Sequence, residues 1–189
     1  VTEDSMAYDL GCSLGASTFA MRSHIEASGA RIVAVDNSPA MIEHGARLLE
    51  QAGPGCPVEL REDDIRSTPL GDASMVVLNY TLQFVPVEER PALLQRVADA
   101  LRPGGILVLS EKVILPDAAL DALTVELHHD FKRAHGYSDL EIAAKRDSLD
   151  NVLTPETLAV HRDRLAGAGF RSSDVWFQCF NFASLVALK

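Results

Sequence analysis

The first residues suited to chemistry lie in a short segment with two glycines near the start of the chain, Tyr8–Gly15. An apolar run ends at Asp9, Gly11 and Gly15 follow, and a helical pattern comes next. Glycine has no Cβ, so the backbone can turn tightly there and approach a ligand closely. The spacing differs from that of dinucleotide-binding loops, because Ser13 stands where a middle glycine would lie. A plain structural turn between a strand and a helix explains two glycines nearly as well.

Three later predicted strands also end in polar residues. In an open α/β sheet the ligand lies beyond the carboxyl ends of the strands, where the strand order reverses. Capping of turns is the usual role of Asp and Asn at such positions and is the alternative. Because several strand ends share the pattern, we expect one ligand site, formed by the glycine loop with Asp36, Asn37, Asp64, Ile65 and Asn79.

The chemistry of these side chains suits a nucleoside joined to an amino acid. A carboxylate at Asp36 can accept hydrogen bonds from both ribose hydroxyls, and it would repel a 2′-phosphate. Asp64 can accept a hydrogen bond from an adenine amino group while Ile65 packs on the ring. Asn79 can both donate and accept, which suits a zwitterionic amino-acid group.

The segments that must position these residues alternate between apolar runs and helical patterns, as in a doubly wound α/β domain. Five strands are predicted, with ends near Leu10, Asp36, Glu62, Asn79 and Leu109, and helices are predicted over 17–29, 39–52, 88–101 and 154–166. After the fifth strand the alternation stops, because residues from 117 to about 150 are typical of two helices without a strand. The runs 175–180 and 185–188 predict a terminal antiparallel hairpin.

Composition limits the class of protein. The 189 residues are 47% apolar, which suggests a single domain over residues 1–189. The 27 acidic residues outnumber the 17 basic ones, for a formal net charge of −10, so a nucleic-acid partner held on a broad basic face is not expected. No apolar run reaches the ~20 residues that cross a bilayer, so no membrane association is expected.

Cysteines and histidines show no pattern of a disulfide framework or a metal site. Cys12, Cys56 and Cys179 are odd in number and widely spaced, which predicts a reducing, cytoplasmic setting. His128 and His129 are neighbours in a predicted helix, where their side chains point about 100° apart, so we expect no metal. Proximity to a helix N-terminus can lower the pKa of a thiol such as Cys12, but we favour a small side chain in a tight loop.

Several longer phrases of the chain are more distinctive than the glycine loop. They are Tyr8–Gly15, Asp36–Glu43, Ser74–Asn79, Thr81–Phe84, Leu109–Lys112, His128–Arg133 and Trp176–Phe182. Together they resemble the carboxy-S-adenosyl-L-methionine synthases, which belong to the class I S-adenosyl-L-methionine (SAM) methyltransferase superfamily. The resemblance covers essentially the whole chain. It implies the Rossmann-like SAM-methyltransferase fold, with a mostly parallel sheet, a helical insertion after the fifth strand and a C-terminal antiparallel hairpin.

The resemblance also implies the activity and the ligand contacts. Enzymes of this family are transferases that convert SAM and prephenate to carboxy-SAM and phenylpyruvate, and a separate enzyme carries the carboxymethyl group to the wobble uridine of tRNA. In the implied mechanism prephenate loses carbon dioxide and its hydroxyl, the released base deprotonates the SAM methyl group, and the resulting ylide captures the carbon dioxide. We therefore expect no side chain as general base. The implied ligand contacts are Gly11, Cys12, Ser13, Asp36, Asn37, Asp64, Ile65 and Asn79.

Arg146 is singled out by the resemblance as both a catalytic and a ligand-binding residue. In the family the matching arginine reaches the carboxylate of the ligand from the partner subunit of a homodimer. Without the resemblance, Arg146 would be one more surface cation. A guanidinium ~6 Å from a sulfonium is repelled by about 3 kcal/mol at an effective dielectric constant of 20, so plain SAM gains nothing from it. A carboxylated methyl group needs such a counter-charge.

Two further expectations concern the surroundings of the ligand. Prephenate has two carboxylates, so basic side chains should line its subsite, and the unranked candidates are Lys112, Lys132, Arg133 and Lys145. Family members carry an N-terminal helical segment that supplies a tyrosine to the ligand, and this sequence, which starts at Val1, shows no counterpart of it. We therefore expect the ligand pocket to be open on one side.

Two other functions stay open on the sequence alone. An ordinary small-molecule SAM methyltransferase would share the fold, and it would release S-adenosylhomocysteine without any need for prephenate. A non-catalytic SAM-binding adaptor would retain its ligand and turn over no substrate mixture. The mass of the small molecule that co-purifies with the protein separates these alternatives.

Overall fold

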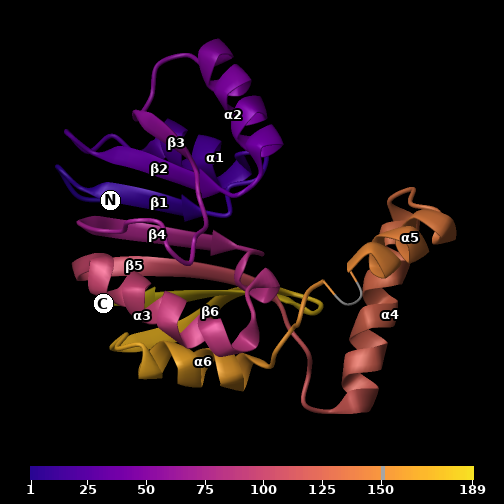
Figure 1. The fold of residues 1–189 in the computed structure, drawn as a ribbon. Coiled ribbons are helices and arrows are strands. Elements are labelled where there is room, and N and C mark those ends of the chain that lie inside the picture. The colour runs from indigo at the N-terminus through magenta and orange to yellow at the C-terminus, as the bar shows by residue number, and fades with distance from the viewer. Residues whose placement is uncertain (150–151) are drawn as a thin grey trace.

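Seven strands form the single sheet of the computed structural model, which describes residues 1–149 and 152–189 (Figure 1). In chain order the strands are β1 Met6–Leu10, β2 Arg31–Asp36, β3 Val58–Glu62, β4 Ala73–Asn79, β5 Leu101–Lys112, β6 Ser172–Cys179 and β7 Phe182–Leu188. Their order in the sheet is β3-β2-β1-β4-β5-β7-β6. The strands from β3 to β5 are parallel, whereas β7 runs antiparallel to both β5 and β6. The order reverses between β1 and β4, and this is where a ligand is expected.

Helices cover both faces of this sheet. They are α1 Ala16–His24, α2 Pro39–Gln51, α3 Arg90–Ala100, α4 Ala118–Ala134, α5 Asp139–Leu149 and α6 Leu158–Gly167, with 3₁₀ turns η1 Leu82–Phe84 and η2 Val87–Glu89. The larger apolar core joins α3 and α6 to the sheet, with Leu94 and Leu165 packed among strand residues such as Leu109. A smaller core lies under α1, where Met21 packs with Ile32. Burial on both faces explains the continuous apolar run of β2.

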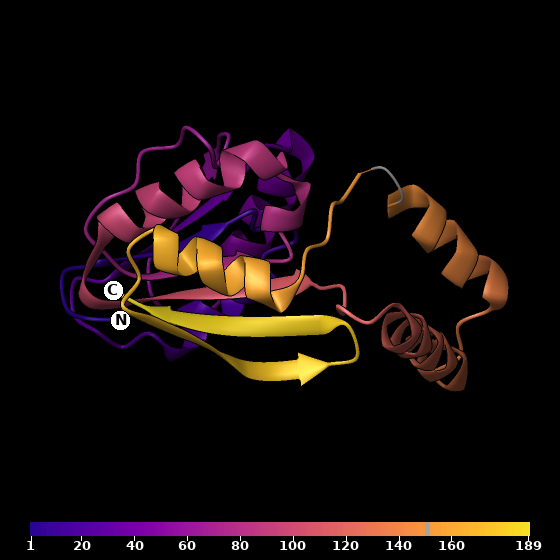
Figure 2. The same cartoon turned by 90° about the horizontal axis from the view of Figure 1, so that it is seen from below.

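Helices α4 and α5 stand apart from the sheet, beyond the end of β5 and the turn between β6 and β7 (Figure 2). The Asp117 side chain caps α4 by accepting hydrogen bonds from the backbone N–H groups of Ala119 and Leu120. The chain returns to the core at Glu156, which bridges to Val113 beside β5. The predicted insertion is confirmed over the described residues, although its expected end near residue 150 lies outside them.

The predicted order of elements is confirmed, but several boundaries were wrong. Helix α6 begins at Leu158, not at residue 154, because Glu156 still bridges to Val113 and Thr157 caps the helix. Helix α1 ends at His24, not near Gly29, because Ile25 already has an extended backbone and packs against the smaller core. Helix α3 begins at Arg90, since η2 occupies the residues before it. Strand β5 starts at Leu101, before the Pro103 to Gly105 stretch that was expected to precede it, because Leu101 already pairs with Ala73.

Candidate active site

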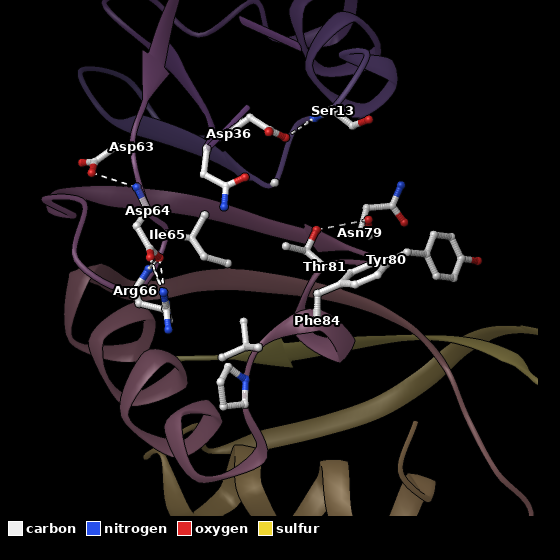
Figure 3. Close-up of a pocket in the computed structure, with 14 residues that line it drawn as sticks. Ser13, Asp36, Asp63, Asp64, Ile65, Arg66, Asn79, Tyr80, Thr81 and Phe84 are labelled. Atoms are coloured by element: carbon white, nitrogen blue, oxygen red, sulfur yellow. Dashed lines mark hydrogen bonds and ion pairs between the residues drawn. The ribbon is translucent and has the colours of Figure 1, made fainter. Parts of the chain in front are cut away.

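The first cavity lies at the point where the strand order reverses and has a volume of about 650 Å³ (Figure 3). Seven of the nine predicted ligand residues line it, namely Gly11, Ser13, Asp36, Asn37, Asp64, Ile65 and Asn79. The remaining lining residues were not among these nine, and they are Asp63, Arg66, Tyr80, Thr81, Phe84, Val85 and Pro86. They come from the loops after β3 and β4, and Thr81 and Phe84 bound one of the phrases on which the family resemblance rests.

The glycine loop needs its glycines for two physical reasons. Gly11 has a φ of 81° and Gly15 a φ of 82°, in the left-handed region that favours glycine. A Cβ on Gly11 would lie 2.4 Å from Cγ2 of Thr81, in the loop after β4. Gly11 therefore lets the loops after β1 and β4 meet at the floor of the first cavity.

Cys12 does not line the first cavity. Its thiol is buried, and its backbone N–H donates to the Val35 carbonyl at 2.9 Å. Burial, followed by the charges of Asp9 and Asp36, raises the pKa of the Cys12 thiol to about 12. The interpretation of Cys12 as a reactive thiol is therefore wrong, and the small side chain in a tight loop is confirmed.

Asp9, the acid that precedes the loop, is buried beside α1. Its Oδ2 accepts a hydrogen bond from the Thr18 hydroxyl at 2.5 Å, which ties the end of β1 to the helix that follows the loop. Burial raises the pKa of this carboxyl to about 6, and the hydrogen bond from Thr18 opposes the shift. Asp9 therefore shapes the loop and does not line the first cavity.

Asp36 faces the first cavity and also holds two loops. Its Oδ2 accepts the Ser13 N–H at 2.8 Å, and its Oδ1 accepts the Ser38 N–H at 2.9 Å. Each carboxylate oxygen has a second acceptor position, so both remain able to accept from a ligand. On the other side of the cavity, the Asn79 Nδ2 donates to the Ser17 hydroxyl at 3.1 Å.

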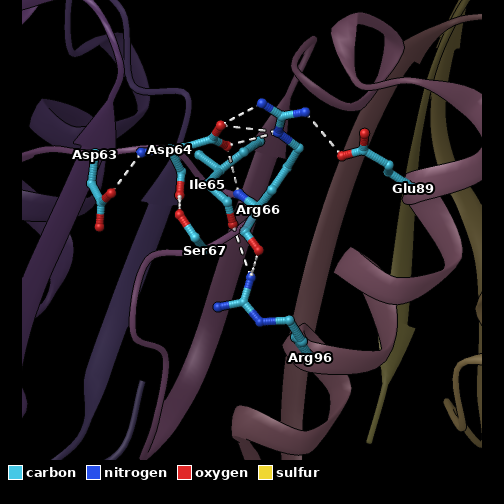
Figure 4. Close-up of polar contacts among 7 residues, drawn as sticks. All are labelled: Asp63, Asp64, Ile65, Arg66, Ser67, Glu89 and Arg96. Carbon is cyan, nitrogen blue, oxygen red and sulfur yellow. Dashed lines mark hydrogen bonds and ion pairs between the residues drawn. The ribbon is translucent and has the colours of Figure 1, made fainter.

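Asp64 is engaged by a residue that the sequence analysis did not identify. The Arg66 guanidinium donates to both carboxylate oxygens of Asp64, at 2.5 and 3.0 Å, and reaches Glu89 at 2.9 Å (Figure 4). These hydrogen bonds hold the pKa of the Asp64 carboxyl below its usual range. Arg96 fixes the same loop by donating to the carbonyls of Ile65 and Arg66. An adenine amino group would therefore share Asp64 with Arg66.

Arg146 lies outside the first cavity. It lines a second cavity of about 620 Å³, which shares Tyr80 and Phe84 with the first. Its guanidinium is exposed, and its contact with the Asp147 carboxylate is long at 3.4 Å. Within one chain the structure thus brings seven of the nine predicted residues together, buries Cys12 behind them and leaves Arg146 separate.

Neither a metal cluster nor a membrane span is found in the part of the chain that the structure describes. Residues 1–149 and 152–189 contain no group of three or more side chains placed to hold a metal ion. His128 instead packs against the ring of Phe182, with centroids 4.9 Å apart. No helix among these residues has the length and apolar character needed to cross a bilayer.

Comparison with known proteins decides between the alternatives for the family. A family model described as a methyltransferase domain matches residues 7–105. A carboxy-S-adenosyl-L-methionine synthase of Geobacter sp. (strain M21) is 58% identical over 186 residues, which cover 98% of this chain and 76% of that protein. One of Erwinia tasmaniensis is 55% identical over 189 residues, which cover 100% of this chain and 77% of that protein. The chain belongs to the carboxy-S-adenosyl-L-methionine synthase family.

Solved structures support the same fold for this synthase-family chain. A SAM-dependent methyltransferase of Methanosarcina mazei aligns with a TM-score of 0.71 at 18% identity, covering 100% of this chain and 94% of that one. Human N-acetylserotonin methyltransferase, solved in complex with SAM, aligns with a TM-score of 0.61 at 18% identity, covering 97% of this chain and 47% of that one. The predicted family, the transferase class and the SAM-methyltransferase fold are confirmed.

Proposed function

We propose that this chain converts SAM and prephenate to carboxy-SAM and phenylpyruvate, and so supplies the carboxymethyl donor for modification of the tRNA wobble uridine. The observation that carries the proposal is 58% identity, over 98% of the chain, to a protein named carboxy-S-adenosyl-L-methionine synthase. We place the reaction in the cytoplasm. The three free cysteines support this location, because a reducing compartment keeps thiols unpaired.

In this proposal SAM occupies the first cavity as a substrate, and the residues present fit it. A cavity of about 650 Å³ has the size of a small-molecule site. The two oxygens of Asp36 accept from the ribose hydroxyls, Ile65 packs on the adenine, and Asp64 accepts from its amino group. Asn79 binds the amino-acid end, and the backbone from Gly11 to Ser13 lies beneath the nucleoside.

The side chains of the protein serve mainly to position the substrates and to exclude water. The chemistry balances without a protein base, because the hydroxide that leaves prephenate takes the methyl proton as water and the carbon dioxide joins the same carbon. Tyr80 and Phe84 line both cavities, so their rings lie where the two substrates would meet. A dry, ordered site keeps carbon dioxide and the reacting carbon together.

The proposal includes a homodimer in which Arg146 serves the partner's site. Two observations support it. Arg146 does not line the first cavity of its own chain. Helix α4 also presents an exposed apolar stripe, formed by Leu120, Leu123, Leu127 and Phe131, with side chains 47–56% exposed. Such a stripe is typical of a surface that a partner covers.

The test is product formation followed by mass spectrometry. Purified protein is incubated with SAM and prephenate, and we expect an adenosyl product heavier than SAM by one carbon dioxide, together with phenylpyruvate. Release of S-adenosylhomocysteine from SAM without prephenate would instead identify a methyltransferase. Retention of SAM with no turnover in any mixture would identify an adaptor. Either result contradicts the proposal.

A further inference from the structure

The second cavity adjoins the first and is built from different elements. It lies between the end of β5, the turn between β6 and β7, and the helices α4 and α5. Its volume of about 620 Å³ matches that of the first cavity, at about 650 Å³. Tyr80 and Phe84 belong to the lining of both, so a ligand in the second cavity would contact the wall of the first.

The charge of the second cavity is opposite to that of the chain. Four of the 17 basic residues line it, namely Lys112, Lys132, Lys145 and Arg146, and no Asp or Glu among the described residues does. Within residues 1–149 and 152–189, none of these lysines forms an ion pair. Burial and then the Lys132 charge lower the pKa of both His128 and His129, which also line the cavity. Cations gathered in a concave site raise the local concentration of anions.

Asn181 adds a buried polar group without a partner. Its side chain is 2% exposed and lines the second cavity, yet its Oδ1 accepts no hydrogen bond from the described residues. A buried polar atom left without a hydrogen bond costs about 1–3 kcal/mol, so such atoms are rare in native proteins. The Asn181 carbonyl accepts the Val113 N–H at 2.8 Å, which fixes the backbone of this residue beside β5.

The turn that carries Asn181 is itself strained. Phe180 has a φ of 52°, in the left-handed region that costs an aromatic residue roughly 1–3 kcal/mol. Its ring packs against His128 at 5.6 Å and Phe131 at 5.5 Å between centroids. These contacts hold the turn against α4, and strain of this kind is typical of functional sites.

The four basic residues proposed for the prephenate subsite differ in their ion pairs and in their exposure to water. The Arg133 guanidinium pairs with Asp130 at 2.6 Å and Asp139 at 2.7 Å, and it does not line the second cavity. Its neighbour Lys132 does line it and is half-buried, as is Lys112, whereas Lys145 is exposed. Of these four residues, Lys112 and Lys132 are therefore the least exposed to water.

We infer that the second cavity binds a small dicarboxylate that carries a hydroxyl group, with Lys112 and Lys132 on the carboxylates and Asn181 on the hydroxyl. Prephenate has this chemistry, so the inference rests on the proposed function and gives its second substrate a site. The Asn181 Oδ1 accepts a hydrogen bond from the hydroxyl group, and the lysines donate hydrogen bonds to the carboxylates. Tyr80, Phe84 and Phe182 surround the ring.

The test measures binding without turnover. Prephenate is titrated calorimetrically into protein saturated with S-adenosylhomocysteine, which lacks the reacting methyl group. We expect Lys112→Ala and Lys132→Ala each to raise the Kd for prephenate roughly 10- to 100-fold, as loss of a hydrogen bond to a charged group predicts. Arg133→Ala is the matched control, since it removes the adjacent cation of the same helix, and it should change this Kd less than twofold. S-adenosylhomocysteine affinity should stay within twofold in all three variants.

Asn181 is tested by comparing two ligands. Phenylpyruvate lacks the ring hydroxyl. Asn181→Leu should therefore weaken the binding of prephenate about tenfold and the binding of phenylpyruvate less than twofold. Thermal unfolding verifies that the variant is folded. If it is not, Asn181→Asp keeps the size of the side chain and should repel the dianion, so prephenate affinity should fall there too.

The outcomes separate this inference from the proposed function. Unchanged prephenate affinity in the Lys112, Lys132 and Asn181 variants, with carboxy-SAM still formed by the wild type, would overturn the site and leave the function standing. Prephenate binding that depends on these residues, without carboxy-SAM formation, would overturn the function and leave the site standing. Wild-type protein that binds no prephenate would overturn the site outright.

Discussion

The Asp36 carboxylate accepts the backbone N–H of Ser13 at 2.8 Å, so the end of β2 holds the glycine loop that follows β1. Its other oxygen holds the start of α2 through Ser38 at 2.9 Å. Turn capping, the alternative role for this residue, is therefore confirmed. Because the same carboxylate also faces the first cavity, a ligand contact at Asp36 stays a prediction that capping does not exclude.

The first prediction tests that contact. Asp36→Ala should weaken binding of SAM and carboxy-SAM by roughly 1.5–3 kcal/mol, because hydrogen bonds from the ribose to a charged acceptor are lost. Glu62→Ala is the matched control: Glu62 ends the adjacent strand β3, opposite Asp36, and does not line the first cavity. Calorimetry on folded variants measures both affinities. Equal affinity in wild type and Asp36→Ala would limit Asp36 to its capping role.

The second prediction concerns stability against pH through Glu111, at the end of β5. Its Oε1 accepts the Leu82 N–H at 3.0 Å, and its Oε2 is buried without a partner among the described residues. Burial raises the pKa of this carboxyl to about 8 from 4.5. Between these values the folded state keeps a proton that the unfolded state has lost, so the free energy of unfolding falls as pH rises through this window.

The titration of His161 limits the pH range in which the effect of Glu111 can be measured alone. It is buried, and burial lowers the pKa of its imidazole to about 4. Protonation of unfolded His161 below pH ~6.5 therefore destabilises the folded state in acid and opposes the Glu111 effect there. Between pH 7 and 8, Glu111 is the one of these two residues that changes the free energy of unfolding with pH. The wild type should lose up to about 1.4 kcal/mol per pH unit in urea unfolding, and Glu111→Gln should flatten this slope. If the free energy of unfolding of Glu111→Gln fell as steeply with pH as that of the wild type, Glu111 would not be the source of the pH dependence.

The third prediction tests the apolar stripe of α4 as the dimer surface. Leu123→Glu combined with Leu127→Glu places two charges on the stripe, and burial of an unpaired charge opposes association. Light scattering should show a monomer for this variant and a dimer for the wild type. Glu126→Ala, an exposed position on the same helix, is the control and should remain a dimer. A dimeric double variant would place the interface elsewhere.

The fourth prediction tests whether Arg146 acts across the dimer. Arg146→Ala and Asp36→Ala proteins are mixed and allowed to exchange subunits, and they are assayed at a SAM concentration too low to occupy the weakened Asp36→Ala site. A mixed dimer has one intact site if Arg146 serves its partner, and random pairing makes about half the dimers mixed. Roughly a quarter of wild-type carboxy-SAM formation should therefore return. No recovery after verified exchange would mean that Arg146 serves its own chain.

The order of the strands and helices could be predicted because each element carries its own local pattern. The β-branched run of β2 and the Ser38–Pro39 start of α2 are visible within a few residues, and the structure reproduces both. The gathering of seven predicted ligand residues around the first cavity was also predictable, since strand ends and a glycine loop mark the edge where ligands bind. Their contact with a ligand stays a prediction. Ends of helices were less predictable, because α1 stops where Ile25 packs against the smaller core, which is a contact between distant segments.

Contacts between distant segments could not be predicted in the same way. The pairing of Arg66 with Asp64 and Glu89 depends on how the loop after β3 meets η2. The second cavity joins Lys112, Lys132 and Asn181 from three separate elements, and no spacing in the sequence links them. The sequence could name basic candidates for a dianion, but only the ion pairs of Arg133 in the folded chain distinguish it from Lys132.

The wall that Tyr80 and Phe84 give to both cavities has a consequence for inhibition. Neighbouring compartments can be occupied by one molecule, in which an adenosyl group is linked to a hydroxylated dicarboxylate. A linker that spans the wall makes the second binding event intramolecular, and avidity can then exceed either single affinity by about 10²- to 10⁴-fold. Such a bisubstrate compound would discriminate against ordinary SAM methyltransferases, because its acidic half would find a matching cationic compartment only where one adjoins the nucleoside.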